Sequence, residues 1–471
     1  MQIFLQNFDL DRIKFLFSCV CHFFFVILQR KIVGVMKKTL SVLLTLMLLA
    51  MCSSAVLLAD EARYVGGDIS LLPRYEQHNS PYRDAYGKNI DNLLTWFMSE
   101  CGWNTFRVRL FVNPGTSDPS VCQDLSYVTS LGQRIKAAGA YFMLDFHYSD
   151  TWVDASHIQA PAAWKGKSDA EMAKALGDYT RDVLMALKSA NATPDLVQVG
   201  NEIMYGLCDI KVHPYDYSGD NWTGYLGLLQ AGCAAVRATC PQAKIIIHTD
   251  RPNEVENTKY YYNKLINAGV DFDILGLSYY PFWHGYLNTT GTNLVGSLQA
   301  YAKAFPDKRI HIVETAYNFQ YWPNEGIKYD TRSLWGNTKP GQYQFVKDLV
   351  DALKPLKSVT GLCYWFPEEA GNGDDTDWNS SKGTVITTWL NRGFWKEEQS
   401  STGHDINRAG QLSNDAQPYT VCAPYYMAAF VKELPAGIER LQNTDYSVQK
   451  VLCEGRMKII RGEKEYSVLG F

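Results

Sequence analysis

The sequence has no strongly basic stretch in the body of the chain and no marked excess of charge of one sign. Charged residues make up 20% of the 471, and the formal net charge is −4. Proteins that bind nucleic acid cluster Lys and Arg on one surface, so this composition argues against a nucleic-acid partner. Disorder is also excluded, because 46% of the residues are apolar, as in ordinary globular proteins.

The sequence also lacks the cysteine spacings of metal sites. Eight of its eleven cysteines follow the N-terminal apolar region, and they form no CxxC pair and no Cys/His cluster of ligand spacing. We therefore expect buried thiols or a few disulfides rather than a zinc site. Cys233 and Cys240 lie on one expected helix. A separation of about 10 Å along its axis argues against a bridge, unless the helix ends early at Pro241.

The N-terminus carries two apolar stretches. Residues 36–59 begin with a methionine and two lysines, continue as an apolar run and end in small residues, which is typical of a secretory signal peptide. Residues 1–35 are interpreted as an over-extended N-terminus, because their apolar stretch is barely long enough for a membrane helix. Cys52 stands in a lipobox-like context, although Met51 occupies the position of a small residue. We expect a secreted or cell-surface protein, with outer-membrane attachment through a lipid on Cys52 as a hypothesis.

From residue 64 onward, short β-branched or aromatic runs alternate with longer segments of helical periodicity. This alternation is typical of repeated βα units around a parallel sheet. Eight runs occur: YVGGDIS from Tyr64, TFRVRLFV from Thr105, YFMLDFHYSD from Tyr141, LVQVGNEI from Leu196, KIIIHTD from Lys244, FDILGLSYYP from Phe272, IHIVETAY from Ile310 and VTGLCYWFPE from Val359. Eight parallel strands close naturally into a barrel. The fold class predicted for residues 60–435 is therefore α/β, a (β/α)8 TIM barrel with extended βα loops.

Helices are predicted between these runs, and several end in Gly or Asn as helix stops do. The segments are NIDNLLTWFMSECG, VTSLGQRIKAAGA, AEMAKALGDYTRDVLMALKSA, YLGLLQAGCAAVRATC, TKYYYNKLINAGV and QYQFVKDLVDALK. Residues 371–418, rich in Asn, Asp, Gly and Ser, are predicted to be an extended eighth loop without structure of its own, before a last helix in APYYMAAFVKEL. Residues 436–471 are predicted to be a short C-terminal β-like tail of two strands, with a truncated sorting or attachment module as a hypothesis.

Polar or aromatic residues follow most of the eight runs where an apolar residue would continue the strand. They are Asp68, Arg107, Arg109, Asp145, His147, Asn201, Glu202, His248, Asp250, Tyr279, Tyr280, Glu314 and Trp365. Each one alone is explained by packing or capping. Their recurrence at the carboxyl ends of eight strands predicts one shared mouth, which is where barrel enzymes build their active sites.

Two glutamates at this mouth form the predicted catalytic pair. Glu202 follows the fourth run directly, and Glu314 ends the seventh. Glycoside hydrolysis needs one protonated carboxyl to assist the leaving oxygen and one carboxylate to attack or to activate water. Carboxyl groups ~5 Å apart predict retention of configuration and a wider gap predicts inversion. Mutual repulsion raises the pKa of one of them, so that it serves as the acid near neutrality.

Neighbouring residues have roles that suit a sugar substrate. Asn201 is a candidate hydrogen-bond donor to the sugar 2-hydroxyl, and Tyr279 or Tyr280 is a candidate to orient Glu314. Trp365 suits a floor on which a pyranose face packs. Glu368 and Glu369 are competing carboxylates, which we rank lower because no other strand end supplies them with a facing partner.

The motifs resemble glycoside hydrolase family 53, the arabinogalactan endo-β-1,4-galactanases. The resemblance runs through GGDIS, FRVRLFVNP, LDFHYSDTW, PDLVQVGNEI, GLSYYPFWHG, HIVETAY and YWFPE, and covers about residues 64–370. It implies a clan A barrel with retaining chemistry, Glu202 as acid/base and Glu314 as nucleophile, acting on β-1,4-galactan of pectic side chains. It also implies that substrate contacts come from Asp68, Arg109, His147, Asp150, Trp152, Trp283, His284 and Trp365.

The loops depart from the family pattern over residues 318–342 and after Asn372, which bears on the preferred chain length. The resemblance implies no cofactor for catalysis, but calcium between loops seven and eight in some bacterial members. Asp375, Asp377 and Asn379 have the alternating oxygen spacing of calcium loops. A solvated acidic loop explains the same residues, because no Gly turn or terminal Glu completes the motif.

Two other functions fit the same sequence. One is another clan A endo-β-glycanase, a mannanase or cellulase, that uses the same two glutamates. The other is a non-catalytic glycan-binding barrel on the cell surface, against which the presence of both glutamates argues. For each reading we expect a monomer whose partner is a polysaccharide.

Overall fold

The computed structural model describes residues 62–77, 82–84, 87–115, 118, 120–288, 293–319, 328–371, 392–396, 411–412, 423–431, 449–453, 456–461 and 464–467. The expected signal segment with Cys52 lies outside this part of the chain, as do the candidate calcium ligands Asp375, Asp377 and Asn379. In the described part no helix is long and apolar enough to cross a membrane.

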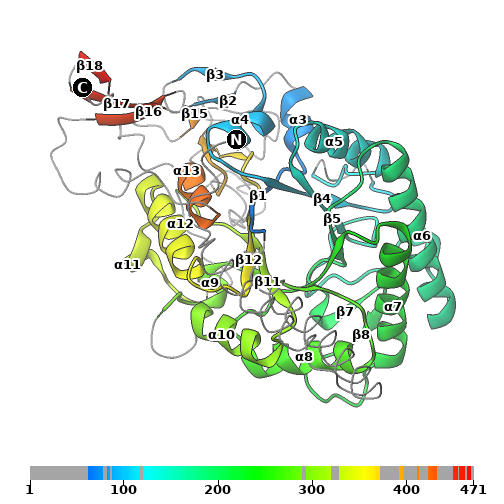
Figure 1. Ribbon diagram of the computed structural model, residues 1–471. Helices are drawn as coiled ribbons and strands as arrows, with labels where there is room; N and C mark the ends of the chain where they lie inside the picture. Colours follow the sequence, from blue (N-terminus) through cyan, green and yellow to red (C-terminus); the bar gives the residue numbers. More distant parts are fainter. Residues whose placement is uncertain are drawn as a thin grey trace, which may run out of the picture. The chain divides into compact units, whose positions relative to one another are not determined.

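Eight parallel strands close into a barrel in the order β1-β12-β11-β10-β9-β6-β5-β4 (Figure 1). The strands are β1 (Tyr64–Asp68), β4 (Thr105–Leu110), β5 (Tyr141–Phe146), β6 (Leu196–Val199), β9 (Lys244–Thr249), β10 (Ile274–Tyr279), β11 (Arg309–Thr315) and β12 (Val359–Trp365). Each lies within one of the eight predicted runs or extends it by one residue. The predicted (β/α)8 barrel is confirmed.

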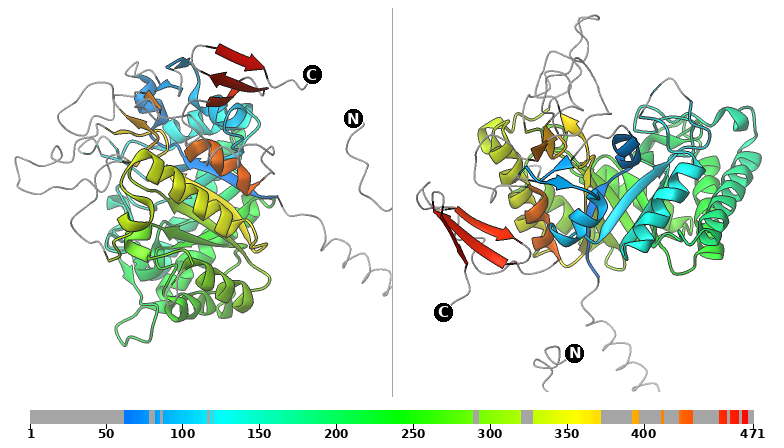
Figure 2. Two further views of the ribbon diagram at one scale, coloured as in Figure 1. Left: turned by 90° about the vertical axis from the view of Figure 1, so that its left-hand side faces the viewer. Right: turned by 90° about the horizontal axis from the view of Figure 1, so that it is seen from above.

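Helices follow the strands around the outside of the barrel (Figure 2). The longer ones are α4 (Leu93–Ser99), α5 (Leu125–Ala137), α6 (Asp169–Ser189), α7 (Trp222–Thr239), α8 (Val255–Asn267), α10 (Leu294–Ala304) and α12 (Lys339–Leu353). Ser168 and Glu171 form a capping box at the start of α6, which satisfies amide groups that the first turn leaves open. The six predicted helices are present. Helix α10 was not among them.

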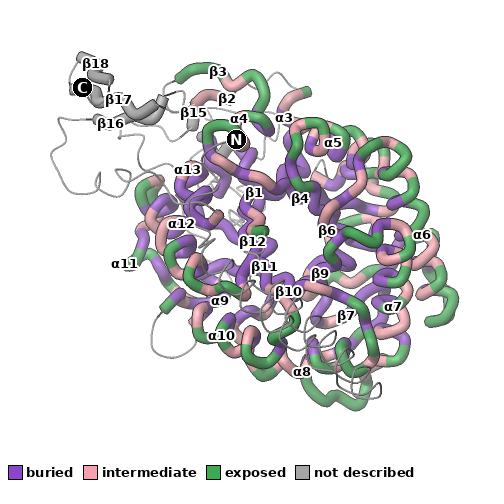
Figure 3. The backbone as a smooth tube through the Cα atoms, in the orientation of Figure 1, coloured by how far each residue is buried: buried purple, intermediate pink, exposed green. Residues whose placement is uncertain are grey.

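The barrel interior changes from apolar to polar along its axis. Met143, Leu196, Ile246, Ile274 and Val313, all on barrel strands, form a separate buried cluster. Towards the carboxyl ends the buried side chains are polar or charged, as described below. Figure 3 shows the barrel strands as mostly buried, whereas exposed residues recur along the helices that surround them. The apolar cluster therefore stabilises the barrel, and the polar side chains at the carboxyl ends of the strands are available for catalysis.

Part of the predicted eighth loop has structure of its own. Strands β13 (Ala370–Gly371), β14 (Trp395–Lys396) and β15 (Gln411–Leu412) join β2 (Tyr82–Arg83) and β3 (Asn89–Ile90) in a five-stranded sheet. Trp395 is fully buried, with ring centroids 5.0 Å from Tyr82 and 5.7 Å from Phe97. The expectation of a loop without structure was wrong here, because its aromatic pair Phe394–Trp395 packs against distant segments.

The chain's last segments also differ in detail from expectation. The last predicted helix is a short α13 (Ala423–Met427) continued by a 3-10 turn (Ala428–Phe430) beside α12, where Tyr426 donates to Asp351 at 2.8 Å. The tail forms three antiparallel strands, β16 (Gln449–Cys453), β17 (Arg456–Arg461) and β18 (Lys464–Ser467), rather than two.

The remaining short elements are α3 (Leu72–Gln77), α9 (Pro281–His284), α11 (Arg332–Trp335) and the hairpin β7 (Gly206–Leu207) and β8 (Ile210–Lys211). Cys122, Cys208, Cys233, Cys240 and Cys363 are free thiols. The expectation that Cys233 and Cys240 do not bridge is confirmed.

Candidate active site

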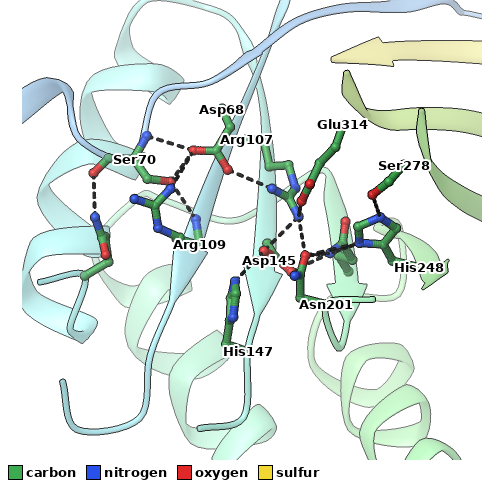
Figure 4. Close-up of polar contacts among 12 residues, drawn as sticks. Asp68, Ser70, Arg107, Arg109, Asp145, His147, Asn201, His248, Ser278 and Glu314 are labelled. Carbon is green, nitrogen blue, oxygen red and sulfur yellow. Dashed lines mark hydrogen bonds and ion pairs between the residues drawn. The ribbon is translucent and has the colours of Figure 1, made fainter. Parts of the chain in front are cut away.

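Buried polar side chains collect at the carboxyl ends of the barrel strands (Figure 4). Side chains alternate across a strand, so positions two apart on β4 and β5 face the same interior. The set comprises Asp68, Arg107, Arg109, Asp145, His147, Gln198, Asn201, His248, Asp250, Ser278, His284 and Glu314, each at most 6% exposed. The structure therefore brings the predicted strand-end residues together in one place.

Arg107 lies at the centre of this set and is 1% exposed. Its Nη1 is 2.8 Å from Asp68 Oδ2, and its Nη2 is 2.9 Å from carboxylate oxygens of both Asp145 and Glu314. Nη2 also donates to Asn201 Oδ1 at 2.8 Å. Burial opposes the charge, but the three carboxylates raise the pKa of Arg107 above its ordinary value. Arg107 is thus a fixed cation that joins four strands.

Asp145 is a permanent anion beside Arg107. Burial opposes its ionisation, but Arg107 and His147 hold the pKa of Asp145 below its ordinary value. Burial lowers the pKa of His147, although Asp145 opposes this. His147 Nδ1 accepts a bond from the Val153 amide at 3.0 Å, so its proton lies on Nε2, which faces Asp145 Oδ2 at 3.2 Å. A neutral histidine therefore braces the anion.

The two carboxylate oxygens of Glu314 have different partners, one charged and one neutral. Oε1 pairs with Arg107, and Oε2 accepts a hydrogen bond from the Tyr280 hydroxyl at 3.0 Å. Burial raises the pKa of Glu314, Arg107 opposes the rise, and Asp145 adds to it. Of the two tyrosines expected to orient Glu314, the structure places Tyr280 on it. Tyr279 instead donates to the Gly285 carbonyl at 2.8 Å.

The turn after β6 sets the position of Glu202. Gly200 has φ +93°, and a Cβ there would lie 2.7 Å from Ile203 Cγ2. Glu202 itself has φ +47°, in the left-handed region that non-glycine residues seldom adopt. Such strain is maintained only where the surroundings enforce it, and it recurs at functional sites. Here it turns the Glu202 carboxyl out of the strand line, partly exposed to the mouth.

Neutral groups hold the Glu202 carboxyl. Ser278 Oγ donates to Glu202 Oε1 at 2.5 Å, and His248 Nε2 lies 2.8 Å from the same hydroxyl. The Glu202 amide donates to His248 Nδ1 at 3.3 Å, which leaves the imidazole proton on Nε2 to be donated to Ser278. Burial and Arg107 lower the pKa of His248 well below its ordinary value. The chain of bonds from amide to imidazole to hydroxyl to carboxyl is uncharged.

The two glutamates differ in how strongly they hold a proton. Burial raises the pKa of Glu202 well above its ordinary value, and the charges of Glu314 and Asp250 raise it further. Glu314 has Arg107 as a compensating cation. The pair therefore keeps its first proton on Glu202 and its negative charge on Glu314, the division of labour that glycoside hydrolysis needs.

Aromatic rings wall one side of the mouth. Trp365 and Phe366 stack with centroids 4.3 Å apart, and Trp152 meets Trp365 edge-on at 6.3 Å. The Arg392 guanidinium lies 3.9 Å from the Trp365 ring centroid, and that of Arg109 lies 4.5 Å from Trp152. Cations over ring faces fix the indoles in place. Trp365 is 7% exposed, and its expected role as a floor for the sugar stays a prediction.

Three of the expected substrate contacts have their side chains engaged with backbone. Asp150 accepts from the amides of Asn113 and Ala162, at 3.0 and 2.8 Å. His284 Nδ1 accepts from the Tyr280 amide at 2.9 Å, and Tyr279 reaches Gly285 as described. Trp283 packs edge-on against Tyr280 at 5.5 Å. Their substrate roles stay predictions.

Asn201 precedes Glu202 in the chain and contacts Arg107, the partner of Glu314. Its Oδ1 accepts from Arg107 Nη2 and from Gln198 Nε2, and its Nδ2 donates to the Val153 carbonyl at 2.7 Å. The amide is thereby locked in orientation. A second Nδ2 hydrogen stays available for the sugar hydroxyl that the sequence predicts.

The competing carboxylates lie away from this pair. Glu368 is fully buried and accepts from the Leu71 amide at 2.9 Å, and Glu369 faces Arg392 at 3.3 Å. Burial raises the pKa of Glu368 to about 8 and that of Glu369 to about 7. Both have local structural partners, which supports the lower rank given to them.

Sequence reasoning left out Ser278, Gln198 and Arg392. Ser278 precedes the predicted tyrosine pair on β10, and the two-residue alternation of the strand would have placed it inside the barrel. Gln198 lies inside an apolar run, and a polar residue at such a position could have been recognised as a candidate for the barrel interior. Arg392 comes from the long eighth loop and gave no signal. Within the described part of the chain no group of three His, Cys, Asp or Glu side chains can hold a metal ion.

A (β/α)8 barrel whose strand ends hold two mutually interacting glutamates, one beside a cation and one beside neutral donors, defines the class of a barrel glycoside hydrolase. The chain belongs to glycosyl hydrolase family 53, whose model matches residues 64–401. The family inferred from the strand-end motifs is thereby confirmed.

Relatives and solved structures agree with this assignment. An arabinogalactan endo-β-1,4-galactanase of Cellvibrio japonicus is 33% identical over 376 residues, which are 76% of this chain and 93% of the relative. An endo-β-1,4-galactanase of Bacillus subtilis is 29% identical over 67% of this chain and 72% of its own length. The GH53 catalytic domain of Ignisphaera aggregans matches with a TM-score of 0.62 at 28% identity, covering 79% of this chain and 97% of that domain.

Proposed function

We propose that this glycoside hydrolase is a retaining endo-β-1,4-galactanase that cleaves galactan side chains of pectin, or type I arabinogalactan, by double displacement. The observation that carries the proposal is the unequal setting of the two glutamates, Glu314 against Arg107 and Glu202 against Ser278. The galactanases of Cellvibrio japonicus and Bacillus subtilis support the choice of substrate.

In the first step Glu314 attacks the anomeric carbon and Glu202 gives its proton to the leaving oxygen. A glycosyl ester forms on Glu314 as the glycosidic bond breaks. In the second step Glu202, now a carboxylate, takes a proton from water, which attacks the same carbon and frees Glu314. Tyr280 and Arg107 hold the nucleophile in place, and Trp365 supplies a face for the sugar.

The proposal includes export of the protein. The signal-like segment from Met36 supports a secreted or cell-surface enzyme acting as a monomer on extracellular polysaccharide, with lipid on Cys52 as its attachment. A structural calcium ion on Asp375, Asp377 and Asn379 belongs to the same proposal. N-terminal sequencing and mass measurement of the exported protein test the first part, and calcium titration followed by melting temperature tests the second.

Digestion of purified polysaccharides tests the activity. We expect the enzyme to release oligosaccharides of mixed length from potato galactan early in the reaction, and to leave mannan and cellulose intact. Mannan or cellulose cut in place of galactan would identify another clan A endo-β-glycanase. Galactan bound but uncut would identify a binding barrel. The matched control is Glu314→Gln, which should bind galactan without cutting it.

A further inference from the structure

Three tyrosines and one histidine form an aromatic strip on the segment that follows Glu202. Tyr205 ends the 3-10 turn Ile203–Tyr205, and His213, Tyr215 and Tyr217 belong to the loop between β8 and α7. The His213 ring centroid lies 6.1 Å from that of Tyr205, 5.2 Å from Tyr215 and 4.4 Å from Tyr217. The four rings thus make one connected surface.

The outer rings of the strip are open to solvent. Tyr215 is 45% exposed and Tyr217 is 57% exposed. Neither hydroxyl has a hydrogen-bond partner among the described residues. Tyrosine side chains as exposed as these bury little apolar surface and so add little to the stability of the fold. A cluster of exposed aromatic side chains therefore indicates a surface that contacts something else.

The loop that carries the strip is held in one conformation. His213 Nδ1 lies 2.6 Å from Asp220 Oδ1, and the His213 amide donates to Asp220 Oδ2 at 2.9 Å. Asp216 accepts from the Tyr260 hydroxyl on α8 at 2.6 Å. A ligand that binds there would therefore lose little free energy in ordering the loop. A binding surface that is preorganised in this way favours affinity.

A chain of contacts connects the strip to the catalytic pair. The Arg251 guanidinium lies 5.5 Å from the Tyr205 ring centroid, and Arg251 Nε is 3.3 Å from Asp250 Oδ2. Asp250 in turn acts electrostatically on Glu202. The strip therefore begins three residues after Glu202, beyond β6, which lies across the barrel from β12 and Trp365.

The chemistry of the acid fixes which part of a substrate would lie there. A proton donor lies next to the leaving oxygen, so sugars bound beyond Glu202 belong to the leaving group. We propose that the aromatic strip is a distal subsite for the reducing-end part of a β-1,4-galactan chain, with galactose faces stacked on Tyr215 and Tyr217. The inference rests on the proposed function and extends it to the leaving-group side.

The charges around the strip select a neutral ligand. Arg251 is paired with Asp250 and lies 3.9 Å from Glu254, and Asp216 is bonded to Tyr260. Because Arg251 is paired, stacking on ring faces is the main attraction that the strip offers. A neutral pyranose chain uses this attraction.

The test compares two substrates of the same enzyme. Galactan fills the leaving-group side with sugars, whereas an aryl β-galactotrioside with a nitrophenol leaving group places no sugar there. For the double variant Tyr215→Ala/Tyr217→Ala we expect the ratio of kcat/KM on galactan to that on the aryl substrate to fall about 3- to 10-fold. Tyr215→Phe/Tyr217→Phe keeps the rings and should retain the wild-type ratio.

Tyr141→Ala is the matched control, because Tyr141 is a 37% exposed tyrosine at the start of β5, at the far end of the barrel from the mouth. Its ratio should equal that of the wild type. An unchanged ratio in the double alanine variant, with galactan still cut by the wild type, would overturn the inference alone. A wild-type enzyme that leaves galactan uncut would overturn the proposed function and the inference with it.

Discussion

The two sides of the mouth surround their glutamates with opposite chemistry. On one side, Glu314 lies in an ionic network in which Arg107 joins Asp68, Asp145 and Glu314 within 2.9 Å. On the other side, the Glu202 carboxyl meets the Ser278 hydroxyl, and no cation pairs with it among the described residues. Glu314 is buried and Glu202 is half-buried, and only Glu314 has a compensating charge.

This contrast separates the two roles. A buried carboxylate beside a guanidinium is stabilised in its charged form, whereas one that lies near other carboxylates and has no cation partner favours its protonated form. The same contrast suits both steps of double displacement, because an ionised nucleophile and a protonated acid must exist at one pH. The predictions below test the contrast, from the largest expected effect to the smallest.

Removing the glutamates should affect two substrates differently. Glu202→Ala should lose about 10²–10⁴-fold in activity on galactan. It should lose far less in the glycosylation step on a dinitrophenyl galactoside, whose leaving group needs no proton. Glu314→Ala should be inactive on both. Initial rates with and without azide measure this, and azide should accelerate Glu202→Ala by replacing water in the second step. Equal losses of Glu202→Ala on both substrates, without azide response, would contradict its role as the acid.

Removing the cation of the ionic side should destabilise the fold. Arg107→Met leaves three buried carboxylates without their partner, so we expect the free energy of unfolding to fall by about 3–5 kcal/mol. The control Arg134→Met breaks the half-exposed pair with Glu76 and should cost ~1 kcal/mol or less. Denaturant titration measures both variants. Similar losses in the two would show that Arg107 is not the centre of the network.

Removing the hydroxyl that contacts Glu202 should shift the basic limb of the pH–activity profile. Ser278→Ala removes a donor that favours the charged form of Glu202, so the pKa of Glu202 should rise by about 0.5–1 unit. The basic limb of the kcat/KM profile reports deprotonation of the acid and should move to higher pH. The acid limb, set by Glu314, should stay. If the acid limb shifted instead, the Ser278 hydroxyl would act on Glu314 and not on Glu202, which would contradict the account.

Replacing the competing carboxylate should leave catalysis nearly unchanged. Glu368 has a pKa raised by burial to about 8 in the folded protein, against an ordinary value of ~4.3. The folded protein therefore holds an extra proton between these values, and the wild type loses stability as the pH rises through that window. Glu368→Gln does not titrate, so its melting temperature relative to wild type should increase from about pH 5 to about pH 8. A loss of turnover at pH 6 would make Glu368 catalytic.

The sequence predicts the barrel because each strand is a local pattern. Eight short runs of branched and aromatic residues suffice to place the strands, and their polar ends suffice to place Glu202 and Glu314 at one mouth. Partners that depend on long-range packing are not predictable in this way. Arg392 reaches Trp365 from a loop with no periodicity, and Trp395 is buried by segments hundreds of residues away.

Choices between neighbours were also beyond the sequence. Tyr279 and Tyr280 are equivalent in the motif, and their alternation on opposite faces of the strand decides that Tyr280 meets Glu314. The same holds for Ser278 on β10, which lies two strands from β6 and reaches Glu202 across β9 and its His248. Which of these side chains meet depends on strand register and barrel closure. Neither can be predicted from a local sequence pattern.

Trapping the glycosyl intermediate tests the division of roles most directly. A 2-deoxy-2-fluoro galactoside with a dinitrophenol leaving group should label the wild-type enzyme once, because the fluorine slows release from the covalent ester. Peptide mapping by mass spectrometry should find the label on Glu314, and Glu314→Gln should take none. A label on Glu202, or no label together with a product of inverted configuration, would contradict the account.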